Sequence, residues 1–183
     1  MSEDQQLIVR TLNGDMQSFR WLVARHERLV AHIAGRIIQD ESELEEICQD
    51  IFLKAYDKLD TFRGDAKFST WIASIAYRMS INHAKKRKVR QVEISEIRNL
   101  AGDEVSGQER MENSDRKAWL EVAISELPEA QRIVITLFHL QEMSYEEVAE
   151  ITGMPVGTVK NYLFRGRKRL KELLEKDLNS DWI

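Results

Sequence analysis

The side chains best suited to chemistry in this chain are clustered cations, and the chemistry they suit is phosphate binding. One basic run extends from Lys160 to Lys171 and another from Arg78 to Arg90, and neither contains an acid. A separate run, residues 40–50, is acidic and contains no base. A single charged run is usually a solvated helix face. Two distant basic runs instead favour nucleic-acid binding, despite a net charge of −4.

No residue pattern predicts catalysis. The sequence contains no phosphate-binding glycine loop, nucleophile elbow or metal-ligand cluster. The histidines lack paired metal spacing and are expected at the surface or half-buried; they are His26, His32, His83 and His139. The one cysteine, Cys48, is expected to be a small buried side chain. The sequence therefore predicts no enzyme and no metal or other cofactor.

The most specific pattern is a helix-turn-helix between Ser144 and Leu170. Ser144 and Glu147 have the spacing of a capping box, which begins a helix. Gly153 can adopt the left-handed conformation that ends this helix, and Pro155 suits the start of the next one. The second helix of such a motif enters the major groove of DNA.

The outer face of that second helix carries polar and basic side chains, which can bind base edges and phosphates. The candidates for duplex DNA binding are Thr158, Lys160, Asn161, Phe164, Arg165 and Lys168. An ordinary helical hairpin with a solvated basic face is the alternative. The agreement of cap, glycine, proline and basic face at one spacing favours DNA binding.

Helical periodicity places these residues in an all-α protein. Apolar side chains recur at helical spacing within 19–37, where His26 lies on the buried stripe, and within 44–55 and 68–79. A short helix is expected near the N-terminus. The pattern dissolves among glycines, serines and charges near residue 89. We predict an N-terminal helical bundle at 1–90, a flexible linker at 91–117 and a helix-turn-helix domain at 118–183.

The sequence also bears on location. No apolar run approaches the roughly 20 residues that span a bilayer. The first residues lack the basic and apolar regions of a signal peptide. We therefore expect a cytoplasmic protein with no membrane insertion of its own.

A loop in the first domain, from Phe62 to Trp71, places aromatic side chains beside cations. Aromatic rings bind single-stranded nucleic acid by stacking, which contributes roughly 1–3 kcal/mol per base. Opening a duplex costs about 1.4 kcal/mol per stacking step, so capture of one or two bases would offset it. The alternative is that Phe68 and Trp71 are core aromatics.

Four segments resemble extracytoplasmic-function (ECF) sigma factors. Residues 46–64, and Phe68-Ser-Thr-Trp71 with the helix to Ala76, are similar to domain two of that family. Residues 127–132 and 144–170 are similar to its domain four. The resemblance covers nearly the whole chain in the family's order, apart from the linker.

The resemblance implies a factor that binds core RNA polymerase and directs it to promoters. An acidic helix would dock on the β′ clamp helices through Glu46, Gln49, Asp50 and Phe52. The −10 element would be bound and melted by Phe62, Arg63, Lys67, Phe68, Trp71, Arg78, Asn82, Lys85 and Lys86. The C-terminal domain would bind the −35 element and the β flap, and the linker would thread toward the RNA exit channel. An anti-sigma factor would be a further partner.

Two positions depart from the family's pattern, and two other classes of protein remain as alternatives. Arg78 stands where many relatives have asparagine, and Asn161-Tyr162 replaces a small residue followed by arginine. The promoter preference is therefore open at both elements. The first alternative is a dimeric helix-turn-helix repressor or activator. An enzyme with an appended DNA-binding domain is the second, and no catalytic pattern supports it.

Overall fold

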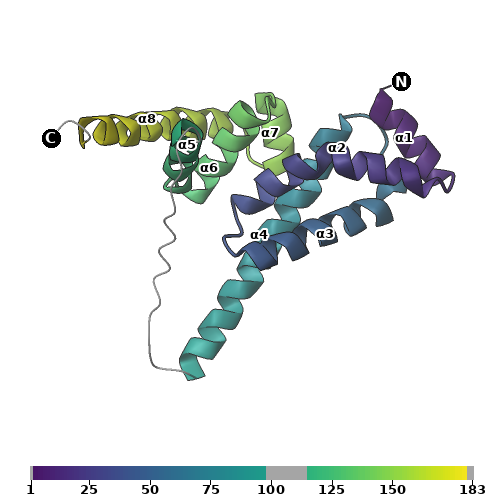
Figure 1. Cartoon of the computed structure of the whole chain (residues 1–183), viewed down its shortest axis with the longest axis horizontal. Helices are drawn as coiled ribbons and strands as arrows, with labels where there is room; N and C mark the ends of the chain where they lie inside the picture. Colours follow the sequence, from purple (N-terminus) through teal and green to yellow (C-terminus); the bar gives the residue numbers. More distant parts are fainter. Residues whose placement is uncertain (1, 98–114, 181–183) are drawn as a thin grey trace.

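The structure is a computed structural model that describes residues 2–97 and 115–180, and this part of the chain is helical with no strand (Figure 1). Two helical domains are present, as predicted. The first contains α1 (Glu3–Leu12), α2 (Met16–Gly35), α3 (Glu41–Asp57), the short 3-10 turn η1 (Leu59–Thr61) and α4 (Phe68–Ile97). The second contains α5 (Asp115–Ser125), α6 (Glu129–Ile135), the π-helical turn η2 (Thr136–Leu140), α7 (Tyr145–Thr152) and α8 (Val156–Ser180).

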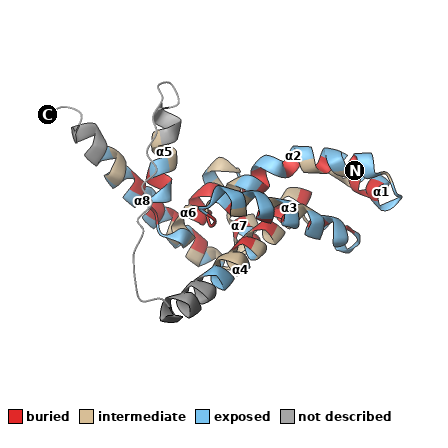
Figure 2. Cartoon of the chain, turned by 60° about the horizontal axis from the view of Figure 1, so that its bottom comes forward, coloured by how far each residue is buried: buried red, intermediate tan, exposed pale blue. Residues whose placement is uncertain are grey.

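The helices of the first domain begin at polar caps and close around one apolar core. The side chains of Asp15 and Asp40 each accept hydrogen bonds from two backbone N–H groups of the following turn. α2 packs on α1, α3 and α4, and the facing side chains are buried (Figure 2). The most enclosed of these are Leu22, Ile33, Ile51, Leu59 and Ile72.

His26 is buried, with 7% of its surface exposed. This agrees with its place on the apolar stripe of α2 and makes the surface or half-buried expectation wrong for this histidine. Its Nε2 lies 3.1 Å from Asp4 Oδ2, and its ring contacts Phe68 edge-on at 5.1 Å. Burial lowers the pKa of His26, and nearby Arg25 lowers it further, whereas Asp4 raises it.

The second domain is built on a close crossing of α6 and α8. A Cβ added at Gly166 would lie 2.9 Å from Ile135 Cγ1, so only glycine fits there without displacement of α6. The buried face of α8 continues through Val159, Leu163 and Leu170. These three side chains hold α8 against the rest of the domain.

α4 is longer than the apolar stripe at 68–79 indicated: the helix continues to Ile97. The predicted linker at 91–117 therefore overlaps the last turns of α4 and the first turn of α5. Its middle, residues 98–114, lies outside the described residues. None of the described helices is long and apolar enough to cross a membrane.

Candidate nucleic-acid interface

The helix-turn-helix forms through the local interactions that its sequence predicts. Ser144 Oγ accepts from the Glu147 N–H at 3.1 Å, and the Ser144 N–H donates to Glu147 Oε2 at 2.9 Å. Gly153 ends α7 with φ +73°, in the left-handed region. The carbonyl of Pro155 accepts from the N–H groups of Thr158 and Val159, which begins α8. The capping box, the glycine and the proline are thus confirmed.

The outer face of α8 is exposed at the positions proposed to bind duplex DNA. Lys160, Asn161, Phe164, Arg165 and Lys168 are exposed, and Thr158 is half-buried. Phe164 has 69% of its surface exposed, so its ring is accessible to a ligand. These side chains share one helix face because they recur three and four residues apart.

Two cations of α8 lie over aromatic rings of the same domain. Lys160 Nζ lies 5.2 Å from the centre of the Tyr145 ring, and the Arg167 guanidinium lies 5.5 Å from that of Phe138. The two rings stack on each other at 4.7 Å. Arg167 Nε also donates to His139 Nε2 at 2.9 Å. Burial, followed by the charge of Arg167, lowers the pKa of His139.

Arg167 is an exposed cation that the sequence analysis left out of its DNA-binding set. The sequence did offer one indication of a DNA-binding role, because Arg167 belongs to the basic run at 160–171. The aromatic pair beneath the two cations limits their side-chain freedom, and less entropy is then lost when they bind phosphate.

The loop from Phe62 to Trp71 gathers its aromatic rings into one cluster. Phe62 contacts Phe68 at 5.6 Å and Trp71 at 5.5 Å, and Phe68 contacts Trp71 at 5.4 Å. Phe68 has 3% of its surface exposed and is a core side chain, whereas Phe62 and Trp71 are half-buried. Phe68 therefore anchors the cluster in the core, although Phe62 and Phe68 both line the cavity beside the loop.

A cavity of about 520 Å³ opens beside these rings, lined by loop residues and by side chains of α1 and α7. Gly64, with φ +78°, turns the chain at its wall. Arg63 and Lys67 are exposed at the same loop. The loop thus combines stacking surfaces with cations, the combination that binds single strands.

The basic run on α4 contains solvent-exposed side chains and one cation that forms an ion pair with α3. Arg78, Asn82, Lys85 and Lys86 are exposed, as a DNA-contacting surface requires. Arg87 Nη1 instead lies 2.8 Å from Glu43 Oε2 of α3. The four exposed residues continue from the aromatic loop along α4, so the loop and α4 form one surface.

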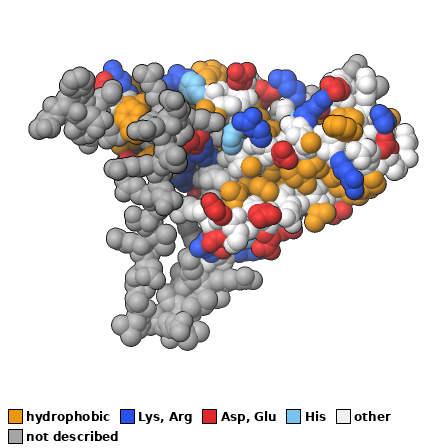
Figure 3. All heavy atoms as spheres, in the orientation of Figure 1, with side chains coloured by type: hydrophobic (Ala, Val, Ile, Leu, Met, Phe, Trp, Pro, Cys, Tyr) orange, Lys and Arg blue, Asp and Glu red, His pale blue; other side chains and the backbone are white. Residues whose placement is uncertain are grey.

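The acidic helix α3 presents a mixed surface. Glu46, Gln49 and Asp50 are exposed, but Phe52 is half-buried against the core. Leu53, three residues beyond Asp50, has 64% of its surface exposed and was not predicted. Acidic side chains lie over α3 beside a band of hydrophobic ones (Figure 3). Because Leu53 is on the face of Glu46 and Asp50, it is the better candidate for the apolar contact that sequence analysis gave to Phe52.

Comparison with known proteins shows the family to which this chain belongs. The family model for sigma-70 region 2 matches residues 22–90, and that for sigma-70 region 4 matches residues 117–170. An RNA polymerase sigma-H factor from Pseudomonas aeruginosa is 32% identical over 182 residues, which cover 94% of each chain. An ECF RNA polymerase sigma-E factor from Escherichia coli K12 is 36% identical over 180 residues, covering 91% of this chain and 92% of the other.

The chain therefore belongs to the ECF sigma factor family, whose members are alternative sigma factors that direct promoter-specific transcription.

Two solved structures share its fold. CnrH, in complex with the cytosolic domain of CnrY, matches with a TM-score of 0.69 at 24% identity and covers 96% of this chain and 99% of that one. The sigma factor RpoE from Bartonella quintana, in complex with the anti-sigma factor NepR, matches with a TM-score of 0.68 at 24% identity and covers 87% and 98%.

Proposed function

We propose that this sigma factor reads promoters with two separate surfaces, one in each domain, and has no catalytic activity of its own. The outer face of α8, including Lys160 and Asn161, binds the −35 element as duplex. The Phe62–Trp71 loop and the basic face of α4 bind the melted −10 element. The observation that carries this proposal is the pairing of half-buried aromatic rings with exposed cations in each domain.

The two surfaces suit different forms of DNA. A helix with exposed polar and basic residues at its N-terminal half fits the major groove of a duplex. Half-buried rings beside cations at a loop fit an unstacked base, because stacking is available only to bases that have left the duplex. Melting is thereby coupled to binding at one of the two sites.

Polymerase binding is assigned to the acidic face of α3. Glu46, Gln49, Asp50 and Leu53 would dock on the β′ clamp helices, while the second domain packs on the β flap. Acidic side chains around an exposed leucine make a typical small interface, with an apolar anchor and a charged rim. The linker would thread toward the RNA exit channel. We also propose an anti-sigma factor as a partner, supported by the complex in which RpoE was solved.

Run-off transcription tests the proposal. The purified full chain is mixed with core RNA polymerase and a promoter library, and transcripts are mapped to their start sites. Promoter-specific transcripts that need the chain are the expected result. Tight binding to duplex DNA by the chain alone, with no initiation in the presence of core enzyme, would contradict the proposal and favour an autonomous repressor or activator.

A further inference from the structure

One exposed cation of α8, Arg167, is held by two adjacent residues that lie outside the helix-turn-helix. Its guanidinium lies 5.5 Å from the centre of the Phe138 ring, and its Nε donates to His139 Nε2 at 2.9 Å. Phe138 and His139 belong to the π-helical turn η2 and also contact each other, ring to ring, at 5.0 Å. An element that precedes the motif therefore sets the direction of an arginine on its second helix.

The contact with His139 leaves the outer end of Arg167 available to a ligand. An acceptor at Nε2 requires a neutral imidazole whose proton is on Nδ1. Burial, followed by the charge of Arg167, lowers the pKa of His139, which favours that neutral ring. Only the Nε–H of the arginine is used, and the donors on its terminal nitrogens are the ones that bind a phosphate bidentately. His139 thus fixes the side chain without competing for a phosphate.

Arg167 also lies on the edge of α8 that would face phosphates. It is about two helical turns, or roughly 10 Å, beyond Lys160, so both cations lie on one edge of the helix. Lys160 lies over Tyr145, whose ring stacks on that of Phe138. A helix with its side chains is about 10–12 Å across, and the major groove is about 12 Å wide. The edges of a helix in that groove therefore face the phosphates that wall it.

We propose that Arg167 binds a DNA phosphate beside the −35 element, and that Phe138 and His139 are positioning residues that hold its guanidinium for this contact. This inference rests on the proposed role of α8. An arginine that is already held in place loses less side-chain entropy when it binds. The gain is in affinity and not in sequence preference, because a phosphate contact carries no sequence information.

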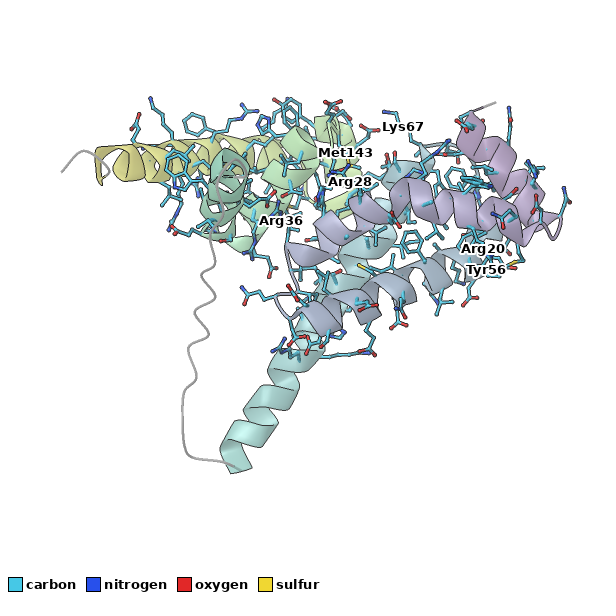
Figure 4. The ribbon with its side chains drawn as sticks, in the orientation of Figure 1. Arg20, Arg28, Arg36, Tyr56, Lys67 and Met143 are labelled. Carbon is cyan, nitrogen blue, oxygen red and sulfur yellow. The ribbon has the colours of Figure 1, made fainter. Side chains whose placement is uncertain are left out.

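Salt titration tests the phosphate contact. Holoenzyme is reconstituted from core polymerase and the full chain, and its affinity for a promoter found by run-off transcription is measured at several salt concentrations. Arg167→Ala should reduce the slope of log K against log salt concentration by about one, by the same amount on promoters with different −35 sequences. The control is Arg20→Ala, which removes the same charge from an exposed position of α2 in the first domain (Figure 4). An unchanged slope in Arg167→Ala, or an equal change in Arg20→Ala, would overturn the proposal.

A double-mutant cycle tests the two positioning residues. Phe138→Leu should weaken promoter binding about twofold to fivefold when Arg167 is present and should have no effect in an Arg167→Ala background. His139→Leu should behave in the same way, and His139→Gln should restore binding, because a glutamine oxygen can accept from the arginine.

Equal losses in both backgrounds would mean that Phe138 and His139 only stabilise the domain, and would contradict their positioning role. Initiation by holoenzyme with the unmodified chain is measured first. It separates failure of this inference from failure of the proposed function.

Discussion

At the scale of single residues, Lys160 is the side chain whose setting most favours base or phosphate binding. It is exposed on the outer face of α8 and held near the Tyr145 ring. We expect Lys160→Ala to weaken binding of polymerase holoenzyme to promoter DNA by about 1–3 kcal/mol if the lysine contacts a base. Lys171→Ala, at a 75% exposed side chain of the same helix, is the control. Gel-shift titrations at several salt concentrations check both; equal losses in the two variants would contradict the assignment.

Trp71 tests the aromatic loop in the same way. Truncation removes a ring that packs on Phe62 and Phe68, so Trp71→Ala should lower open-complex formation, read by permanganate reactivity of unpaired thymines. Trp21→Ala is the control, because Trp21 belongs to the same domain and has 60% of its surface exposed. Thermal unfolding of both variants separates misfolding from lost stacking. Normal open complexes from a folded Trp71→Ala protein would refute the role.

Gly166 carries a prediction about packing rather than DNA. The added methyl group of Gly166→Ala would meet Ile135 at 2.9 Å. Overpacking of this kind costs about 1–3 kcal/mol of unfolding free energy. Chemical denaturation measures it, and Gly166→Ala should cost less in an Ile135→Ala background, which lacks the Cγ1 atom that the added methyl group meets. Unchanged stability in the single variant would mean that α6 moves away freely.

At the scale of elements, two glycines near the end of α7 should respond oppositely to substitution by alanine. Gly153 has a positive φ, so Gly153→Ala should cost about 1–2 kcal/mol. Gly157 lies in α8 with no atom within 4 Å of an added Cβ, and Gly157→Ala should stabilise the helix by roughly 0.5–1 kcal/mol. Urea denaturation compares them. No loss of stability in Gly153→Ala would show that the turn does not require the left-handed conformation.

The elements also mark how far the sequence predicts this molecule. Capping boxes, apolar stripes and the Gly153 turn depend on neighbours within four residues, and these were predictable. The Gly166 crossing and the His26–Asp4 contact depend on partners more than twenty residues away in the chain. Only folding brings such partners together. The exposure of Leu53 beside half-buried Phe52 was not predicted, because adjacent residues differ by a rotation of the helix that periodicity alone does not resolve.

At the scale of the whole molecule, His26 couples folding to pH. Burial lowers its pKa from an ordinary value near 6.5, despite Asp4, so the folded protein resists its protonation. Above that value the histidine is neutral in both states and contributes nothing. As pH falls below it, the unfolded chain binds a proton first, and the free energy of unfolding decreases until the folded pKa is passed. Urea denaturation between pH 7 and 5 should show this slope, reduced in His26→Gln. Identical slopes would contradict it.

The two carboxylate oxygens of Glu147 contact different elements, and this determines whether α7 must unfold before the contact between the domains can break. One oxygen accepts from the Ser144 N–H at the start of α7, and the other contacts Lys67 of the Phe62–Trp71 loop. Loss of the Lys67 contact would therefore leave the capping box intact, and α7 need not unfold when this ion pair breaks. Domain motions without local unfolding take microseconds to milliseconds. We infer that this contact between the two domains can open and close on that timescale while the helix-turn-helix stays folded.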